Sequence, residues 1–306
     1  MRYSLDMDKL IAFGWYGGKY SHLDWLLPLL PEATHYCEPF GGSAAVLLNR
    51  VPAPVETYND IDGEVVNFFR VLRDDHDALI RAIGLTPFSR EELRIASQEP
   101  LDGLSDLERA RRFFVRARQV RTGLAQTASN GRWAHCKLTS RAGMAGAVSR
   151  WLGSVEGLSE IVQRLLRVQI ENAPAIEVIQ RYDSEETFFY CDPPYAHDSR
   201  TDVKAYRYEM KNHEHRKLAD VLHNVKGKVA ISGYHSELMD KLYSDWRCIE
   251  SNPKKAHSTN TRADTVKQER VEVLWVNYAL PTSPEQDTPE CQIQQTSLMP
   301  LFKEPL

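Results

Sequence analysis

The stretch from Phe188 to Tyr195 constrains the fold of this chain more than any other. Its first four residues, Phe-Phe-Tyr-Cys, are apolar or aromatic, as in a strand buried on both faces of a parallel sheet. The strand must stop after Asp192, because Pro193 and Pro194 each fix φ and lack an N–H. The chain therefore leaves in a rigid loop at the carboxyl edge, where open α/β sheets bind ligands. A carboxylate, free carbonyls and an aromatic ring at that edge suit a planar molecule with an exocyclic amine, such as adenine.

A strand and a glycine turn are also predicted earlier in the chain. Residues 34–43 read Thr-His-Tyr-Cys-Glu-Pro-Phe-Gly-Gly-Ser, and an apolar helix pattern follows. This order predicts a strand, a turn in which Gly41 and Gly42 admit a nucleoside, and a helix whose N-terminus faces it. The sequence has no Gly-x-Gly-x-x-Gly here, so a dinucleotide fingerprint is not supported. Upstream, Trp-Tyr-Gly-Gly-Lys at residues 15–19 adds aromatic surface, a tight turn and one cation, and a helix is expected from Ser21 to Leu30.

The next predicted strand, Val55 to Tyr58, ends at Asn-Asp-Ile-Asp. An acidic residue at the end of the second strand is well placed to accept hydrogen bonds from a ribose diol. Asp60 and Asp62 both fit this position, and both could instead cap the helix expected over residues 63–73. The spacing favours the ribose role for one of the two and does not choose between them.

The amino-acid composition limits the classes to which the protein can belong. A content of 42% hydrophobic and 26% charged residues is that of an ordinary soluble globular protein, and no apolar run is long enough to cross a bilayer. With no signal-peptide pattern, we expect an intracellular protein without a membrane partner. The cysteines are scattered. His213 and His215 stand two residues apart on a helix for which Asn212 is the predicted N-cap, so they cannot face the same way. We therefore expect no metal.

The formal net charge of −4 conceals a strongly basic segment. From Arg111 to Arg150 the sequence has nine Arg or Lys residues and no Asp or Glu. Residues 80–170 interrupt the α/β alternation with a mainly helical pattern, and residues 122–133 resemble a polar, glycine-broken loop. A charged helix face is usually just solvated, but this excess favours a phosphate-binding face for nucleic acid. The candidate DNA contacts are Arg116, Arg118, Arg121, Asn130, Arg132, Lys137 and Arg141.

Four motifs occur in a fixed order along the chain: Trp-Tyr-Gly-Gly-Lys, Glu-Pro-Phe-Gly-Gly-Ser, Asn-Asp-Ile-Asp and Asp-Pro-Pro-Tyr. Together they resemble the Dam-type, alpha-class family of N6-adenine DNA methyltransferases. The resemblance implies S-adenosylmethionine as cofactor and double-stranded DNA as substrate. It implies an α/β fold, a Rossmann-like class I methyltransferase sheet with an inserted, mainly helical target-recognition domain. The methyltransferase domain would occupy residues 1–79 and 171–280, the DNA-binding insert residues 80–170, and a flexible tail residues 281–306.

The matching positions assign roles to individual residues. The cofactor site would comprise Trp15, Lys19, Glu38, Phe40, Gly41, Gly42, Asp60 and Asp192, so Asp60 rather than Asp62 would hold the ribose. The catalytic loop would comprise Asp192, Pro193, Pro194 and Tyr195. In this loop the aspartate and the first proline carbonyl would accept the two N6 hydrogens, and the tyrosine would stack on a flipped base. Tyr16 departs from the family, since many members carry a small residue there.

Several alternatives stay open. Pro-Pro-Tyr loops also occur in enzymes that methylate RNA or the glutamine amide of a protein. Those loops usually begin with Asn, whereas this one begins with Asp192. A DNA-binding regulator without turnover is a third reading, and the intact motifs argue against it. Residues 295–302 loosely resemble peptides that dock on bacterial sliding clamps. The tail therefore either makes a weak contact with such a clamp or packs locally against the protein. We expect a bacterial cytoplasmic enzyme, encoded by a chromosome or a phage; the recognised bases and any paired restriction nuclease stay open.

Overall fold

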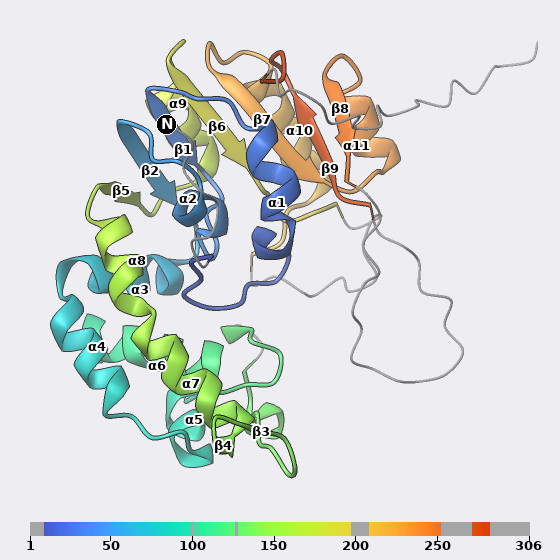
Figure 1. Cartoon of the computed structure of the whole chain (residues 1–306). Helices are drawn as coiled ribbons and strands as arrows, with labels where there is room; N and C mark the ends of the chain where they lie inside the picture. Colours follow the sequence, from blue (N-terminus) through green and yellow to red (C-terminus); the bar gives the residue numbers. More distant parts are fainter. Residues whose placement is uncertain are drawn as a thin grey trace, which may run out of the picture.

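The computed structural model describes residues 9–98, 101, 103–125, 128–196, 208–251 and 271–281. Within them, a central sheet contains β1 (His35–Glu38), β2 (Val55–Asn59), β5 (Val168–Glu171), β6 (Thr187–Cys191), β7 (Lys228–Gly233), β8 (Arg247–Glu250) and β9 (Val273–Val276). The strands lie in the order β5-β2-β1-β6-β7-β9-β8 (Figure 1). The first five in that order pair in parallel, and β9 runs antiparallel between β7 and β8. The predicted α/β class with a Rossmann-like, mostly parallel sheet is confirmed.

The strand β6 lies in the middle of the sheet, and all five of its residues are buried. Phe189 lies opposite Cys37 of β1 and Val229 of β7. A strand covered on both faces has to be apolar throughout, which is why its sequence predicts a buried strand. Cys37 and Cys191 are fully buried, as expected of small apolar side chains.

Two hydrophobic clusters cover the two faces of the sheet. Phe188 and Tyr190 of β6 belong to one cluster, and their neighbours Phe189 and Cys191 belong to the other, because successive side chains of a strand point to opposite faces. The helices that flank the sheet are α1 (Leu23–Leu26), α2 (Ala45–Asn49), α3 (Gly63–Asp74), α9 (Ala175–Tyr182), α10 (Asn212–Leu222) and α11 (Glu237–Leu242).

Two local features differ from what the sequence predicts. The helical pattern from Ser21 to Leu30 forms three short pieces, a 3-10 turn at Lys19–His22, the helix α1 and a second 3-10 turn at Leu27–Leu29. Pro28 is the second residue of that second turn, where its missing N–H removes an α-helical hydrogen bond. At α10 the N-cap is Lys211 and not Asn212.

Residues 76–165 form most of the remaining helices, α4 (His76–Gly84), α5 (Arg90–Ala96), α6 (Asp106–Arg118), α7 (Gly146–Glu156) and α8 (Leu158–Leu165). A hairpin of β3 (Ser140–Arg141) and β4 (Met144–Ala145) precedes α7. Figure 1 shows α4, α5, α7 and the hairpin grouped at one end of the molecule, with the sheet at the other. Phe114 of α6 stacks on Phe68 of α3 with ring centroids 5.6 Å apart, so both ends share one hydrophobic core. The predicted domain boundaries at residues 80 and 170 stay predictions.

No helix in the described part of the chain combines the length and the apolar character that a membrane span requires. Except for Pro281, the predicted tail lies outside the described residues, and so does its predicted clamp contact.

Candidate active site

The candidate site lies at the carboxyl edge of the sheet, where β1 and β6 are neighbours. The chain continues from β1 to β2 on one side and from β6 to β7 on the other, so the strand order reverses between them. Ligands of open α/β sheets bind at such a point. A cavity of about 640 Å³ opens there, a size typical of small-molecule sites. Its walls include all eight predicted cofactor residues, Trp15, Lys19, Glu38, Phe40, Gly41, Gly42, Asp60 and Asp192.

The floor of the cavity is a glycine turn that fits against two aromatic rings. A Cβ atom added to Gly41 would lie 2.2 Å from Cε2 of Tyr58. Gly42 has a φ of +50°, and a Cβ there would lie 2.7 Å from Nε1 of Trp15. The Tyr58 hydroxyl donates a 2.8 Å hydrogen bond to the Gly42 carbonyl. Only glycine therefore fits at these positions, and the backbone forms the surface that a ligand would meet.

The structure separates the roles of the two acidic residues after β2. One carboxylate oxygen of Asp60 accepts a 2.8 Å hydrogen bond from the Gly42 N–H, and the other accepts one of 2.8 Å from the Asp62 N–H. Burial raises the pKa of Asp60 to about 6. Asp62 instead accepts a 3.1 Å bond from the Glu64 N–H and is the N-cap of α3. Asp62 therefore has the capping role, while Asp60 joins the glycine turn to the second strand.

Glu38 ends β1 and is almost fully buried. The Tyr36 hydroxyl donates a 2.5 Å hydrogen bond to its carboxyl group. Burial raises the pKa of Glu38 to about 8, which the hydrogen bond only partly opposes. The side chain is therefore mostly protonated at neutral pH.

The catalytic loop meets the N-terminal segment through an ion pair. The Lys19 ammonium lies 2.7 Å from both carboxylate oxygens of Asp192, and it donates a 2.9 Å bond to the Gly17 carbonyl. Its side chain is 3% exposed, whereas that of Asp192 is 18% exposed and lines the cavity. Burial raises the pKa of Asp192, and the nearby Lys19 opposes that shift. The two carboxylates around Lys19 outweigh its own burial and raise its pKa, so the ammonium stays charged.

Tyr195 and Glu272 complete this cluster. The Tyr195 hydroxyl donates a hydrogen bond to the Glu272 carboxylate, which also lies 3.2 Å from the Lys19 ammonium. The Tyr195 ring is 5% exposed, and Lys19 Nζ lies 5.0 Å from its centroid. Pro193 is buried, and Pro194 lines the cavity. Of the four predicted catalytic residues, Asp192 and Pro194 therefore line the cavity, whereas Pro193 and Tyr195 are buried next to them in the chain and do not line it.

Sequence reasoning missed Glu272 and part of the cavity wall. Glu272 stands between two valines just before β9, and such an acid commonly faces solvent; its burial depends on Lys19, which is remote in the chain. Residues 174–176 at the start of α9 and Met210 near α10 also line the cavity. The available signal for residues 174–176 was their position after a strand that ends at the same edge.

Tyr16 and His213 line the cavity as well. In the described part of the chain, no group of three or more His, Cys, Asp or Glu side chains could hold a metal ion.

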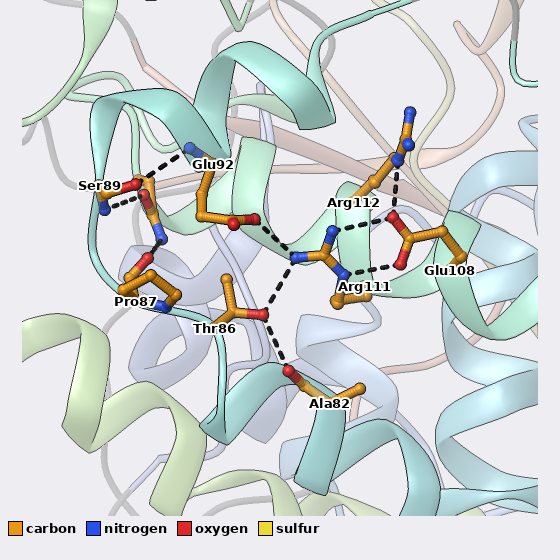
Figure 2. A network of polar contacts seen from close by, with 9 residues as sticks. Ala82, Thr86, Pro87, Ser89, Glu92, Glu108, Arg111 and Arg112 are labelled. Atoms are coloured by element: carbon orange, nitrogen blue, oxygen red, sulfur yellow. Dashed lines mark hydrogen bonds and ion pairs between the residues drawn. The ribbon is translucent and has the colours of Figure 1, made fainter.

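The arginines at the start of the basic segment belong to a network within the protein. Arg111 lies 2.9 Å from Glu92 and 2.7 Å from Glu108, and it donates a 3.0 Å bond to the Thr86 hydroxyl. Arg112 donates a 2.8 Å bond to Glu108 as well (Figure 2). The hydrogen bonds from these arginines lower the pKa of Glu108 to about 2. The network joins the ends of α4, α5 and α6.

Arg116 and Arg118 also point into the protein. Arg116 donates a 2.8 Å bond to the Ala96 carbonyl and lies 3.6 Å from Glu64. Arg118 donates bonds of 2.9 and 2.7 Å to the carbonyls of residues 11 and 12. Burial lowers the pKa of Arg118 to about 10. In this structure Arg116 therefore joins α6 to α5 and α3, and Arg118 joins α6 to the N-terminal segment.

The other predicted DNA contacts lie beyond α6. Val120 and Trp133 form an antiparallel bridge that closes the loop between them, and Asn130 lies in a 3-10 turn of that loop, Asn130–Arg132. In the β3–β4 hairpin, Ala142 and Gly143 have φ angles of 52° and 74°, as in a type I′ turn. The exposed basic residues of the loop and hairpin are Arg121, Arg132, Lys137 and Arg141.

Comparison with known proteins agrees with this site. A sequence profile of the D12 class N6 adenine-specific DNA methyltransferases matches residues 15–260, from the first cavity residue to beyond β8. The Type II methyltransferase M1.LlaDCHI of Lactococcus lactis subsp. cremoris is 26% identical over 289 residues, which cover 86% of this chain and 94% of that relative. A DNA adenine methylase of Vibrio cholerae is 27% identical over 205 residues, 64% of this chain and 69% of the relative. The resemblance seen in the four motifs is confirmed: the chain belongs to the family of D12 class N6 adenine-specific DNA methyltransferases.

Proposed function

We propose that this adenine-specific DNA methyltransferase uses S-adenosylmethionine and methylates N6 of an adenine flipped out of duplex DNA. The observation that carries the proposal is the Asp192 carboxylate, which reaches the cavity wall beside a glycine turn at the switch point of the sheet. We further propose that it acts in the bacterial cytoplasm.

The walls of the cavity fit this cofactor. S-adenosylmethionine supplies an electrophilic methyl group on a positively charged sulfur. Asp60 has a carboxylate for the ribose diol, and the tight turn at Gly41 and Gly42 leaves backbone rather than side chain facing a nucleoside. Apolar residues 174–176 offer surface to a flat base. Asp192 adds negative charge on the side where a cationic sulfur would lie.

The chemistry at the amine requires acceptors more than a base. Asp192 and the Pro193 carbonyl accept the two N6 hydrogens, so that the nitrogen lone pair leaves conjugation with the ring and points at the methyl carbon. Transfer to this nitrogen would break the methyl–sulfur bond of S-adenosylmethionine, and the electron pair of that bond would stay on sulfur. N6 then carries the positive charge and loses a proton, for which Asp192 is the nearest acceptor. Lys19 stays charged and cannot take it.

The target base has to leave the helix first, because N6 is buried in duplex DNA, and flipping costs roughly a few kcal/mol. Tyr195 would stack on the flipped ring. We propose that residues 80–170 form the recognition part and that Arg121, Asn130, Arg132, Lys137 and Arg141 contact DNA. Arg116 and Arg118 are left out, because their guanidinium groups contact the protein.

The first test is to express the protein in a host that lacks adenine methylation and to sequence the host DNA with a method that detects N6-methyladenine. Methylation at one short motif is the expected result. Soluble protein that binds S-adenosylmethionine and leaves the DNA unmodified would contradict the proposal and favour an RNA substrate or a regulator without turnover.

A further inference from the structure

We infer that Glu272 is a positioning residue that receives the Lys19 ammonium when the target amine takes its place on Asp192. The inference rests on the proposed role of Asp192 as the acceptor of the N6 hydrogens. It concerns a residue that lies outside the four motifs.

Lys19 occupies the acceptors that the target needs. An ammonium group has three N–H donors. Its three shortest contacts are to the two oxygens of Asp192, at 2.7 Å each, and to the Gly17 carbonyl at 2.9 Å. Both oxygens of the catalytic carboxylate are therefore engaged by one cation. An incoming amine has to take one of these oxygens, and Lys19 then loses a hydrogen-bond acceptor.

Glu272 is placed to compensate for that loss. Its Oε1 atom lies 3.2 Å from Lys19 Nζ, so a movement of a few tenths of an ångström would convert an ion pair into a short hydrogen bond. Within the described residues, the acceptor groups around the Lys19 ammonium are Gly17, Asp192 and Glu272. A buried ammonium left with an unsatisfied N–H would be costly. Glu272 thus lets Lys19 release one Asp192 oxygen and stay fully paired.

The position of Glu272 is fixed from three sides. Its N–H donates a 3.0 Å bond to the Ser251 hydroxyl, and its carbonyl accepts a 2.8 Å bond from the Ser251 N–H. The Tyr195 hydroxyl donates to the same Oε1 atom that faces Lys19. The side chain is 4% exposed, so solvent cannot easily replace it. Glu272 is therefore a fixed acceptor beside Lys19 and the Tyr195 hydroxyl. Lys19 can exchange one hydrogen bond between Asp192 and Glu272, which both keep their positions.

The test is a pair of DNA duplexes carrying the motif that the wild-type protein methylates. One has adenine at the target position, and the other has purine, which lacks the 6-amino group. Binding is measured with S-adenosylhomocysteine present, so that no reaction occurs. For Glu272→Gln we expect the affinity for the adenine duplex to fall by about tenfold, because a neutral amide oxygen pairs with the ammonium more weakly than a carboxylate does. The affinity for the purine duplex should change less than twofold, because purine does not displace Lys19.

Two further variants separate the explanations. Tyr195→Phe keeps the ring and removes the hydroxyl, and any loss of affinity that it causes should be equal for the two duplexes. Glu64→Gln removes another buried carboxylate, one that pairs with Arg109 away from the cavity, and should leave both affinities unchanged.

Equal losses on both duplexes for Glu272→Gln would show a purely structural role and overturn the inference. Unchanged binding of both would also overturn it. A Tyr195→Phe variant that reproduces the adenine-specific loss would show that Glu272 acts through the tyrosine and not through Lys19. Failure of the underlying function would be seen separately, as the absence of any motif methylated by the wild-type protein.

Discussion

The cavity edge and the basic segment both contain buried ion pairs, yet their sequences differ in how well they predict the structure. At the cavity edge, short motifs place their side chains through the backbone next to them, as Asp192 follows β6 and Gly42 follows β1. In the basic segment, the count of charges misses the acids that lie just before it. Glu108 precedes Arg111 by three residues, and Glu92 and Glu64 pair with Arg111 and Arg116 from other helices. A local excess of charge is therefore a weaker signal than a motif at a strand end.

The largest effect should come from the catalytic carboxylate. Asp192→Ala removes the acceptor for the N6 hydrogens, and we expect turnover to fall by about 10³-fold or more, the scale seen for loss of a key stabilising group. Methylation of the recognised duplex is measured with saturating S-adenosylmethionine. The melting temperature should also fall, because the buried Lys19 ammonium loses the carboxylate that accepts two of its hydrogen bonds, so turnover is compared at a temperature where the variant is folded. Near-normal turnover there would sink the proposed mechanism.

The basic segment should divide into two classes of residue. Replacing Arg121, Arg132, Lys137 and Arg141 together by alanine should weaken DNA binding and reduce the slope of log affinity against log salt by roughly one for each phosphate that is no longer bound. Binding is measured at several salt concentrations.

The matched control for that experiment is Arg118→Ala. It should lower the free energy of unfolding by about 1–3 kcal/mol, because two part-buried carbonyls lose their donor, and leave the salt slope unchanged. A reduced slope in Arg118→Ala, or an unchanged slope in the fourfold variant, would contradict this division into DNA-binding and structural basic residues.

Glycine substitutions compare the same two regions. Gly41→Ala would place a methyl group against the Tyr58 ring, so we expect a loss of about 2 kcal/mol in the free energy of unfolding and weaker cofactor binding. Gly131→Ala, in the basic segment, has open space around the added Cβ and serves as the control. Chemical denaturation and cofactor titration measure both variants. Equal behaviour of the two would show that the floor of the cavity tolerates movement.

The smallest predicted effect is a pH dependence. Because burial raises the pKa of Asp60 to about 6, its carboxylate is ionised above that pH and protonated below it. Affinity for S-adenosylmethionine should fall by roughly tenfold between pH 7 and pH 5, since one pH unit below the pKa leaves about a tenth of the group ionised. Glu38, with a pKa of about 8, stays protonated over this interval. Asp60→Asn should bind weakly and lose this pH dependence; a persisting tenfold change would assign it to another group.

The sequence alone was sufficient to predict those parts of the site whose position depends on residues next to them in the chain. Asp192, Gly41, Gly42 and Asp60 follow strands, and their neighbours force a break or a turn at the cavity. It was insufficient where partners are remote in the chain. Glu272 meets Lys19 only because β9 lies beside β7, and no local pattern around it predicts that contact. The helix expected from Ser21 to Leu30 failed for a local reason, the proline within it.

The position of β9 bears on how the protein is synthesised. β7 and β8 both precede β9 in the chain, yet β9 separates them in the sheet. While the ribosome is still making residues 251–276, each of the two strands has an edge that nothing yet pairs, a state that favours association with other chains. Glu272 directly precedes β9 and emerges with it. The nascent chain therefore acquires the partner of Lys19 at the moment when β9 can pair with both β7 and β8.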